Sequence, residues 1–461
     1  MKVKVISRSA NDYIRETNHD IHKVNRNYDP SLHPFALNRE YKRALNSVKL
    51  DRIFAKPFIG SLDGHSDSVQ KLTKHPKKVG VLFSAACNGE IKLWNLTNHH
   101  CMRTIKAHNG IVRNVCIPNH GNYCFSVDDN QNIKQWDLSF LNDNIMEMDS
   151  DLQLSLQCTE EVPINTIVAK NPIYYMDNNR HKPMFLTCGQ GVDLWEENRT
   201  QPLRSWEWGN DTVNHIRFNP IEQDLAVAAS NDRSIILYDI RKPQPARKVV
   251  LAMRSNAICW NPMEAFVFTV ANEDYNLHTF DIRKFGFPLQ VHKDHISAVI
   301  SLDYSPTGKE FVSAGYDKTI RFFTTLGRRS HEIYHTKRMQ RLTDIVWSYD
   351  NRYVISSSDE MDIRIWKANA SEKLGFKAPR ETNNFRYQDK LKDKFAYHPE
   401  VRRIAKHRHV PKHIFSGQKE LQTIKESQDR KEANRQAHKK PDAKSKNYNF
   451  EVKKQIVREE K

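Results

Sequence analysis

Short stretches of alternating apolar and polar residues recur through the middle of the chain, and each contains an aromatic side chain near its end. Residues 91–95 read Ile-Lys-Leu-Trp-Asn, and residues 133–137 read Ile-Lys-Gln-Trp-Asp. Apolar residues at every second position predict a β-strand, because successive side chains of a strand point to opposite faces. The aromatic positions of the seven stretches are Trp94, Trp136, Trp195, Tyr238, Phe280, Phe323 and Trp366.

The spacing of these aromatic residues identifies a repeat. The intervals are 42, 59, 43, 42, 43 and 43 residues, and five of them fall within the period of about 40–45 residues that is typical of WD repeats. The longest interval contains an acidic stretch at 143–151 and a turn-rich stretch at 176–183. We interpret both stretches as surface insertions.

Polar residues recur in phase with the strands. Each repeat has a polar residue or a glycine at the position three residues before the first apolar residue of its strand. The seven are Asn88, Asn130, Gly189, Asp232, Asp274, Asp317 and Glu360. An acid or amide there can accept hydrogen bonds across a tight turn. Some repeats also open with a histidine, at His65, His108 and His295. Seven such units predict an all-β fold, a seven-bladed WD40 β-propeller with four antiparallel strands in each blade.

One strand of this ring is missing from the repeats. The seventh repeat ends at its third strand near Lys367, and the first begins near Gly64. We predict that residues 53–61 supply the outer strand of blade seven, so that the propeller spans 53–367. Deletion of 53–61 should then unfold the propeller cooperatively, and an unchanged melting temperature would contradict this closure.

The two ends of the chain differ from the middle in charge. The whole chain has a net charge of +17, with 72 basic and 55 acidic residues. Residues 53–367 are neutral, with 36 of each sign, whereas 1–52 carry +5 and 368–461 carry +12. We therefore expect a basic N-terminal extension at 1–52 and a basic, partly helical C-terminal extension at 368–461.

Helical patterns are found in both extensions. Residues 39–50 place apolar side chains at 41, 44, 45 and 48, on one face of a helix that we expect to dock on the propeller or a partner. Pro399 could begin a helix and Pro411 could end it. Ser416 is the expected N-cap of a polar helix that runs to Lys440. The last twenty residues have the composition of a basic, poorly ordered tail.

Several classes of protein are excluded by what the sequence lacks. No apolar run approaches the ~20 residues needed to cross a bilayer, and the first residues lack a signal-peptide core. The seven cysteines form no CxxC pair, which favours a reducing compartment. Because no P-loop, GxSxG, HExxH or dinucleotide motif is found, we expect no catalytic residues, cofactor or small-molecule substrate. The histidines at 398, 407, 409 and 413 lie among basic residues that would repel a metal ion.

The candidate contact residues form two groups. A basic cluster in the C-terminal extension contains Arg402, Arg403, Lys406, Arg408 and Lys412. Positions 402, 406 and 409 would share a helix face that could follow phosphates of RNA or meet a partner protein, although a solvated face or a nuclear localisation signal has the same composition.

The second group comes from two adjacent repeats that end alike. It consists of Tyr238, Asp239 and Arg241, and of Phe280, Asp281 and Arg283. Here the Asp and Arg could simply seal the turn after the third strand, or they could contact another protein.

The chain resembles the Sof-type WD-repeat proteins of the eukaryotic small-subunit processome. The resemblance rests on residues 43–46 and 52–58 before the propeller, on 271–277, and above all on the tail at 398–412. It implies a non-catalytic scaffold of the nucleus and nucleolus that supports processing of the 18S rRNA precursor. The implied partners are processome proteins, a small nucleolar ribonucleoprotein and pre-rRNA, with no membrane.

A second role is also implied by the resemblance. Metazoan members are described as substrate receptors of cullin-4 RING ubiquitin ligases, and such receptors often carry an aromatic-Asp-x-Arg box on adjacent blades. The six residues of the second group match this box, with Tyr238 and Phe280 in place of Trp. The alternative function is therefore that of a ligase receptor, in which these residues would bind the adaptor.

Overall fold

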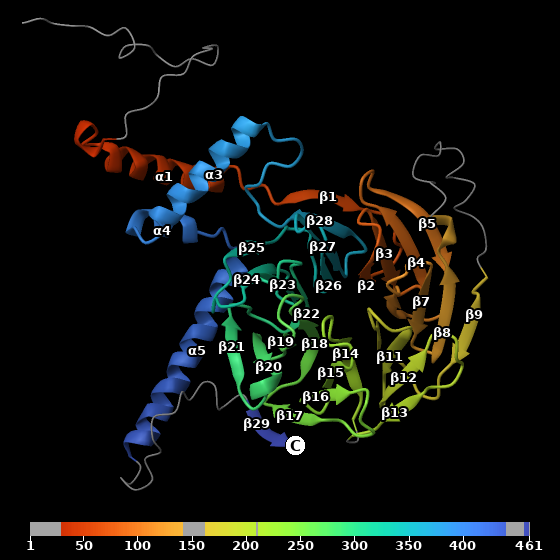
Figure 1. The fold of residues 1–461 in the computed structure, drawn as a ribbon. Coiled ribbons are helices and arrows are strands. Elements are labelled where there is room, and N and C mark those ends of the chain that lie inside the picture. The colour runs from red at the N-terminus through yellow and green to blue at the C-terminus, as the bar shows by residue number, and fades with distance from the viewer. Residues whose placement is uncertain (1–28, 142–161, 209–210, 439–455, 461) are drawn as a thin grey trace, which may run out of the picture. The chain divides into compact units, whose positions relative to one another are not determined.

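The computed structural model describes residues 29–141, 162–208, 211–438 and 456–460, which form two compact units (Figure 1). The first unit is built from the described parts of Met1–Ala55 and from Lys373–His407. The second is built from Lys56–Glu372 and Arg408–Lys461, again in their described parts. The C-terminal extension, which we expected to be one region, is thus divided between the two units.

The second unit contains seven antiparallel sheets, of which six follow the order of the chain. Blade one contains β2 (Val69–Lys74), β3 (Val81–Ala86), β4 (Glu90–Asn95) and β5 (His100–Lys106). Blade two contains β6 (Val112–Cys116), β7 (Tyr123–Asp128), β8 (Asn132–Asp137) and β9 (Asn165–Val168). Blade three contains β10 (Tyr175–Asn178), β11 (Met184–Cys188), β12 (Val192–Glu196) and β13 (Arg204–Trp206). Blade four contains β14 (Val213–Phe218), β15 (Leu225–Ser230), β16 (Ser234–Asp239) and β17 (Arg247–Leu251). Blade five contains β18 (Ser255–Trp260), β19 (Val267–Asn272), β20 (Asn276–Asp281) and β21 (Pro288–Lys293). Blade six contains β22 (Val299–Tyr304), β23 (Glu310–Gly315), β24 (Ile320–Thr324) and β25 (Glu332–Tyr334). Blade seven joins β26 (Leu342–Trp347), β27 (Tyr353–Ser358) and β28 (Ile363–Lys367) to β1 (Phe58–Leu62).

The sheets are the blades of a closed ring. The first strand of each sheet contacts the first strand of the next, and β26 contacts β2, so the ring has seven blades around a central channel. The seven predicted aromatic residues all lie on the third strand of a blade. They are buried, and the apolar faces of neighbouring blades pack together around them. The predicted seven-bladed propeller is therefore confirmed.

The strand β1, which precedes the first blade in the chain, closes the ring. β1 pairs antiparallel with β28, placing Phe58 opposite Trp366 and Leu62 opposite Ile363. Leu62 is fully buried. The strand covers 58–62 instead of 53–61, because the preceding residues continue a helix as far as Ile53.

That helix, α1 (Ala36–Ile53), forms the first unit with α3 (Pro379–Lys394) and α4 (Pro399–Lys406). Its apolar face buries Ala44 and Val48, the positions that the sequence placed on one side. The Tyr41 hydroxyl donates to Glu400 at 2.8 Å, and its ring meets Phe395 edge-on at 5.9 Å. The partners that cover α1 in this unit are thus helices of the C-terminal extension. Helix α3 was missed by the sequence analysis.

The ends of the C-terminal helices differ from those expected. Pro399 begins α4 as predicted, but the helix ends at Lys406, because His407 adopts an extended backbone. Pro411 therefore ends no helix. It directly precedes α5 (Lys412–Ala437), so that Ser416 lies inside α5 and is not its N-cap. His409 lies between the helices, so the expected stripe of 402, 406 and 409 is wrong.

Two more sequence interpretations are corrected by strands. Residues 175–178 form the inner strand β10 of blade three, so the turn-rich stretch at 176–183 is not a surface insertion. Residues 456–460, expected in a poorly ordered tail, form β29 (Ile456–Glu460), which pairs with β17 as a fifth strand of blade four. The acidic stretch at 143–151 lies outside the described residues. The short 3-10 turns are η2 (Pro30–Leu32), η3 (Ser139–Leu141) and η5 (Ile282–Lys284).

Candidate interaction surfaces

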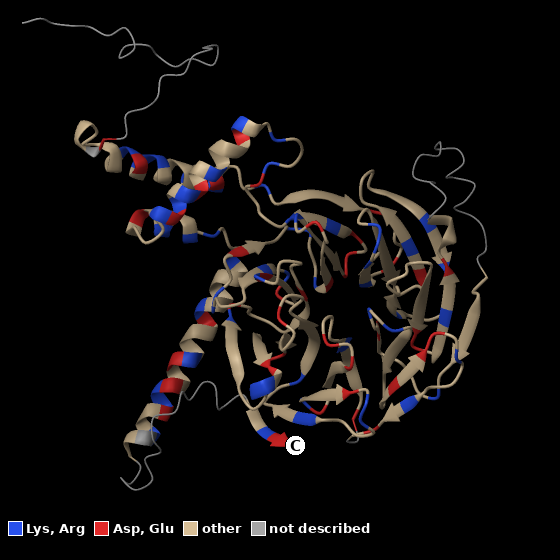
Figure 2. Cartoon of the chain, viewed as in Figure 1, with Lys and Arg blue, Asp and Glu red and all other residues tan. Residues whose placement is uncertain are grey.

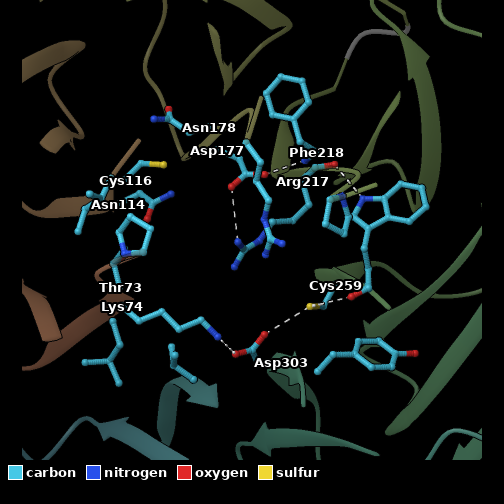
Figure 3. Close-up of a pocket in the computed structure, with 18 of the residues that line it drawn as sticks. Thr73, Lys74, Asn114, Cys116, Asp177, Asn178, Arg217, Phe218, Cys259 and Asp303 are labelled. Atoms are coloured by element: carbon cyan, nitrogen blue, oxygen red, sulfur yellow. Dashed lines mark hydrogen bonds and ion pairs between the residues drawn. The ribbon is translucent and has the colours of Figure 1, made fainter. Parts of the chain in front are cut away.

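The inner strands enclose a polar channel with a cavity of about 570 Å³ (Figure 3). Its charged side chains are arranged in pairs, with Lys74 Nζ 3.1 Å from Asp303 and Arg217 3.5 Å from Asp177. A third pair joins Lys71 to Asp344 at 2.9 Å. These six charges therefore compensate one another in pairs along the channel wall.

The carboxylates of these pairs also join neighbouring blades. Asp177 accepts a hydrogen bond from the Phe218 amide at 2.7 Å, and Asp303 accepts one from the Trp347 amide at 2.8 Å. Asp344 accepts the Leu72 amide at 2.9 Å. The other four junctions are bridged by hydrogen bonds from Thr73 to Val115, Asn114 to Met176, Asn219 to Ala265 and Asn256 to Val299. The channel residues therefore hold the ring together.

Sequence reasoning missed these channel residues. Their signal was available, because the third or fifth position of the inner strands is repeatedly polar or charged, as Asp303 is at the fifth position of β22. A polar group at such a position must find a partner when it is buried. In a ring that partner is the next blade.

The histidines that open the repeats have structural contacts. His65 Nε2 lies 2.5 Å from Ser84 Oγ, which also accepts the Trp94 indole N–H at 2.7 Å. His295 lies between Ser313 at 2.6 Å and Asp317 at 2.9 Å. These Ser-His and Asp-His pairs resemble parts of a catalytic triad, but Ser84 and Ser313 are fully buried. Burial lowers the pKa of His65 to about 4, which keeps the imidazole neutral.

The expected turn contacts are found in several repeats. The carboxylate of Asp274 accepts the Asn276 amide at 2.9 Å, and Asp317 accepts the Thr319 amide at 3.1 Å. In blade two the acceptor is Asp128, two residues before the expected Asn130. These residues therefore shape the turns between the second and third strands.

The two repeat ends with an Asp-x-Arg sequence are built alike. Arg241 donates from Nε and a terminal nitrogen to the two oxygens of Asp239, at 3.0 and 3.1 Å. Arg283 holds Asp281 in the same way, at 3.1 and 2.9 Å. These hydrogen bonds hold the pKa of Asp239 below its usual range. Each pair seals the turn after a third strand.

The same geometry leaves the arginines available to a partner. The side chains of Arg241 and Arg283 are 69% and 67% exposed. Tyr238 and Phe280 are 1% and 0% exposed, because they pack in the core between the blades. Of the six residues in this group, the two arginines therefore offer the contact surface, and the aromatic residues cannot reach a partner.

The basic cluster of the C-terminal extension is divided between the units. Arg402, Arg403 and Lys406 are exposed on α4 in the first unit and form no ion pair with a described residue. Arg408 and Lys412 belong to the second unit. Arg408 is half-buried with its Nε 4.0 Å from Glu332, whereas Lys412 is exposed at the start of α5. The five residues thus do not form one helical stripe.

Charge is distributed differently in the two units (Figure 2). Residues 29–55 and 373–407, the described part of the first unit, contain 15 basic and 7 acidic residues. Basic and acidic residues alternate along α5 and over the blades. The described part of the first unit therefore carries a net charge of +8 in 62 residues, a much higher density of positive charge than the +7 in 331 residues of the second unit.

Within the described ranges, no three His, Cys, Asp or Glu side chains gather as a metal ion would require. Nor is any helix in these ranges long and apolar enough to span a bilayer.

The ring of seven blades, the aromatic third strands and the Ser-His-Trp contacts together define a WD-repeat β-propeller. A WD domain, G-beta repeat model matches residues 99–137, 286–324 and 330–367, and a Sof1-like domain model matches 368–456. The chain belongs to the Sof1-like family of WD-repeat proteins.

Similar proteins cover nearly the whole chain. "DDB1- and CUL4-associated factor 13" is 52% identical in Xenopus tropicalis and 51% identical in Homo sapiens, with 96% of each chain covered in both comparisons. "Protein SOF1" of Saccharomyces cerevisiae is 40% identical over 99% of this chain and 94% of its own. The crystal structure of the WD40 propeller domain of Doa1 matches with a TM-score of 0.56 over 68% of this chain and 96% of that one. At 14% identity, this last likeness shows the fold alone.

Proposed function

We propose that this protein is a non-catalytic scaffold of ribosome assembly, a component of the nucleolar small-subunit processome that supports processing of the 18S rRNA precursor. The proposal is supported by the family, because the resemblance to Sof-type proteins implies this role and Protein SOF1 aligns over 99% of this chain and 94% of its own. The observation that carries it is the exposed basic side of α4 in the Sof1-like domain. There Arg402, Arg403 and Lys406 lack ion pairs with the described residues.

The chemistry of α4 fits a phosphate backbone. Burial of Val401 against the first unit fixes the helix, so that its arginines project from a supported element. Arginine presents several donors to phosphate oxygens, and release of counterions from RNA adds to affinity. The propeller, neutral over 53–367, would meanwhile dock proteins through its faces.

The test reverses the charge of α4. In the triple variant Arg402→Glu, Arg403→Glu, Lys406→Glu, we expect the slope of log affinity for single-stranded pre-rRNA against log salt to fall by about 2, at about 0.7 for each lost contact. Co-sedimentation with pre-ribosomal particles should weaken as well. Arg408 is left unchanged, because it is half-buried beside Glu332 and its replacement would affect folding as well as binding.

The matched control carries the same charge change on the blades. Lys77, Lys106 and Lys309 are exposed there, and their replacement by Glu should leave RNA binding and sedimentation close to wild type. If the α4 variant keeps its salt slope and its particle association, α4 is not the RNA anchor. Loss by both variants would mean that only net charge matters.

Nucleolar localisation is part of the same proposal. A fluorescently tagged full-length chain should overlap a nucleolar marker in the cells of its source. Uniform cytoplasmic fluorescence would contradict the assembly role.

A second function, that of a substrate receptor of a cullin-4 ubiquitin ligase, is favoured by the two exposed arginines. Arg241 and Arg283 are held in one orientation by forked hydrogen bonds, which reduces the entropy lost on binding a partner. The relatives named as DDB1- and CUL4-associated factors direct this proposal toward DDB1 as the adaptor.

The discriminating experiment is a pull-down with DDB1. We expect Arg241→Ala with Arg283→Ala to reduce adaptor capture and leave particle association intact. The control pair is Arg254→Ala with Arg341→Ala, since these arginines also pair with acids and are 48% and 56% exposed. They lie at the other ends of the strands, so their loss should not affect the adaptor. Equal capture by the first pair and wild type would rule out this role for the boxes.

A further inference from the structure

The outer edge of blade four is occupied by a strand from the far end of the chain. β29 runs antiparallel to β17, with Glu460 opposite Lys248 and Ile456 opposite Leu251 (Figure 1). Among the described sheets, this is the blade that has five strands, and the others have four. The position of β29 raises the question of why this edge accepts a strand.

The answer lies in the regularity of β17. It has five residues and pairs with β16 in an unbroken register. The outer strands β1, β5 and β21 each have an irregularity in their pairing, and β9, β13 and β25 have four residues or fewer. Bulges and short length hinder edge pairing, so β17 is the described outer edge best suited to receive another strand.

The neighbouring surface fits the chemistry of β29. Ile456 packs against the apolar cluster that contains Val249, Leu251 and Phe285. A Cβ at Gly286 would come 2.5 Å from the carboxylate of Glu459, so the glycine leaves room for the end of this side chain. The site therefore combines an open ladder with an apolar contact at one end and a glycine beside the exposed Glu459 side chain at the other.

The strand itself is held by few side-chain contacts. Val457, Arg458 and Glu459 are exposed, and Ile456 is the residue that reaches the apolar cluster. A five-residue strand with one partly buried apolar side chain gains little from burial. Main-chain hydrogen bonds, which any extended segment can supply, make up most of the attachment.

We propose that the outer edge of β17 is a strand-docking site for a partner protein, which the C-terminal strand occupies in the free chain. The partner would supply an extended segment with an apolar residue followed, three and four residues later, by carboxylates, the pattern of Ile456, Glu459 and Glu460. Recognition would take place by strand addition, and β29 would leave when the partner strand binds. This inference does not depend on the proposed function.

The first test compares the binding of a labelled peptide of residues 453–461 to the intact chain and to a chain that ends at residue 455. A chain that ends at residue 455 should bind the peptide saturably in fluorescence polarisation. The intact chain should bind at least tenfold more weakly, because its own tethered strand competes at an effective concentration in the millimolar range. A peptide with Ile456→Asp should fail to bind the shortened chain.

A matched pair of variants keeps the test independent of truncation. Ile456→Asp in the intact chain should release β29 and increase peptide binding toward that of the shortened chain. Val457→Asp, on the 67% exposed neighbour, should leave it unchanged.

Three results would overturn the proposal. These are no peptide binding by the shortened chain, equal binding by the intact and shortened chains, and an equal effect of the two aspartate variants. A concentration-dependent dimer of the intact chain that Ile456→Asp abolishes would also overturn it, since the strand would then belong to a second copy.

Discussion

At the scale of single residues, the most informative groups are polar side chains buried inside the blades. His65 shares Ser84 with the Trp94 indole, and His292 lies 2.9 Å from Thr279 and 2.5 Å from the Gly327 carbonyl. Both imidazoles are buried. Their hydrogen bonds fix the third strands, which explains why polar residues recur in a repeat whose main signal is apolar.

These histidines make the propeller sensitive to acid. Burial lowers the pKa of His65 and His292 from 6.5 to about 4. Between these values the unfolded chain binds a proton on each histidine and the folded chain does not, so the free energy of unfolding decreases as the pH falls. From pH 7 to pH 5 we expect a loss of about 2 kcal/mol for each histidine.

Denaturant titrations at the two pH values measure this loss. His292→Gln should be less stable than wild type at pH 7, yet it should lose about 2 kcal/mol less on acidification. The exposed His100 provides the control, because His100→Gln should retain the pH dependence of wild type. An identical dependence in His292→Gln would show that this histidine does not couple folding to protons.

At the scale of the element, the sequence predicted strands better than helix ends. The third strands were found because an aromatic residue recurs at fixed spacing. The closing strand was placed five residues too early, since nothing in residues 53–57 reveals that α1 continues to Ile53. Helix α4 ended early and α5 began at Lys412, because tertiary contacts such as burial of Val401 and Ile414 outweighed the capping signals of Pro411 and Ser416.

The elements missed by the sequence analysis depend on distant partners. Helix α3 has one buried side chain, Leu391, and is stabilised by α1 rather than by an apolar stripe of its own. β29 is short and charged, and its pairing requires the edge of β17, about two hundred residues earlier. The candidate contact residues show the same contrast between local and distant causes. The exposure of Arg241 and Arg283 could be inferred from the turns in which they lie. The separation of Arg402 from Arg408 could not, because it depends on how distant segments of the chain pack.

The closing strand gives a direct test at this scale. Leu62→Ala should destabilise the propeller by about 2–5 kcal/mol, the cost of a large-to-small change at a buried position. A single cooperative transition at lower temperature is expected, because blade seven contacts both of its neighbours. Thermal unfolding followed by tryptophan fluorescence measures this change.

The neighbouring Asp63 provides the control for that measurement. Asp63→Ala changes an exposed residue beyond the end of the strand and should shift the transition little. A Leu62→Ala protein with the melting temperature of wild type would show that β1 does not hold the ring closed.

At the scale of the whole molecule, charge and packing follow the two units. The neutral propeller has its charges paired within the channel and across the blades. The helical unit combines N-terminal and C-terminal segments through Lys394–Glu40 and Lys392–Asp51 pairs, both at 2.6 Å. It has the higher density of positive charge, with +8 in its 62 described residues. Protein docking and RNA contact are therefore assigned to different units under the proposed function.

The independence of the units can be tested at Val48, which is 5% exposed on α1. Val48→Asp should loosen the helical unit, because a buried carboxylate without a partner costs several kcal/mol. Limited proteolysis should then cut within α3 and α4 while the propeller keeps its melting temperature. Lys49→Asp, a change at the adjacent exposed position, should have no such effect.

If Val48→Asp lowered the melting temperature of the propeller as much as Leu62→Ala does, the two units would fold as one. The helical unit would then be part of the scaffold's core rather than a separate arm.

The pairing of β1 with β28 has a consequence for the synthesis of the protein. Leu62 is translated early, but its partner Ile363 follows 301 residues later. A nascent chain can form individual blades as they emerge, yet it cannot complete the ring before the last blade has left the ribosome. Until then the first and last blades expose their edges, and such edges invite aggregation. We therefore expect the growing chain to require a chaperone during this interval, until β28 has emerged and pairs with β1.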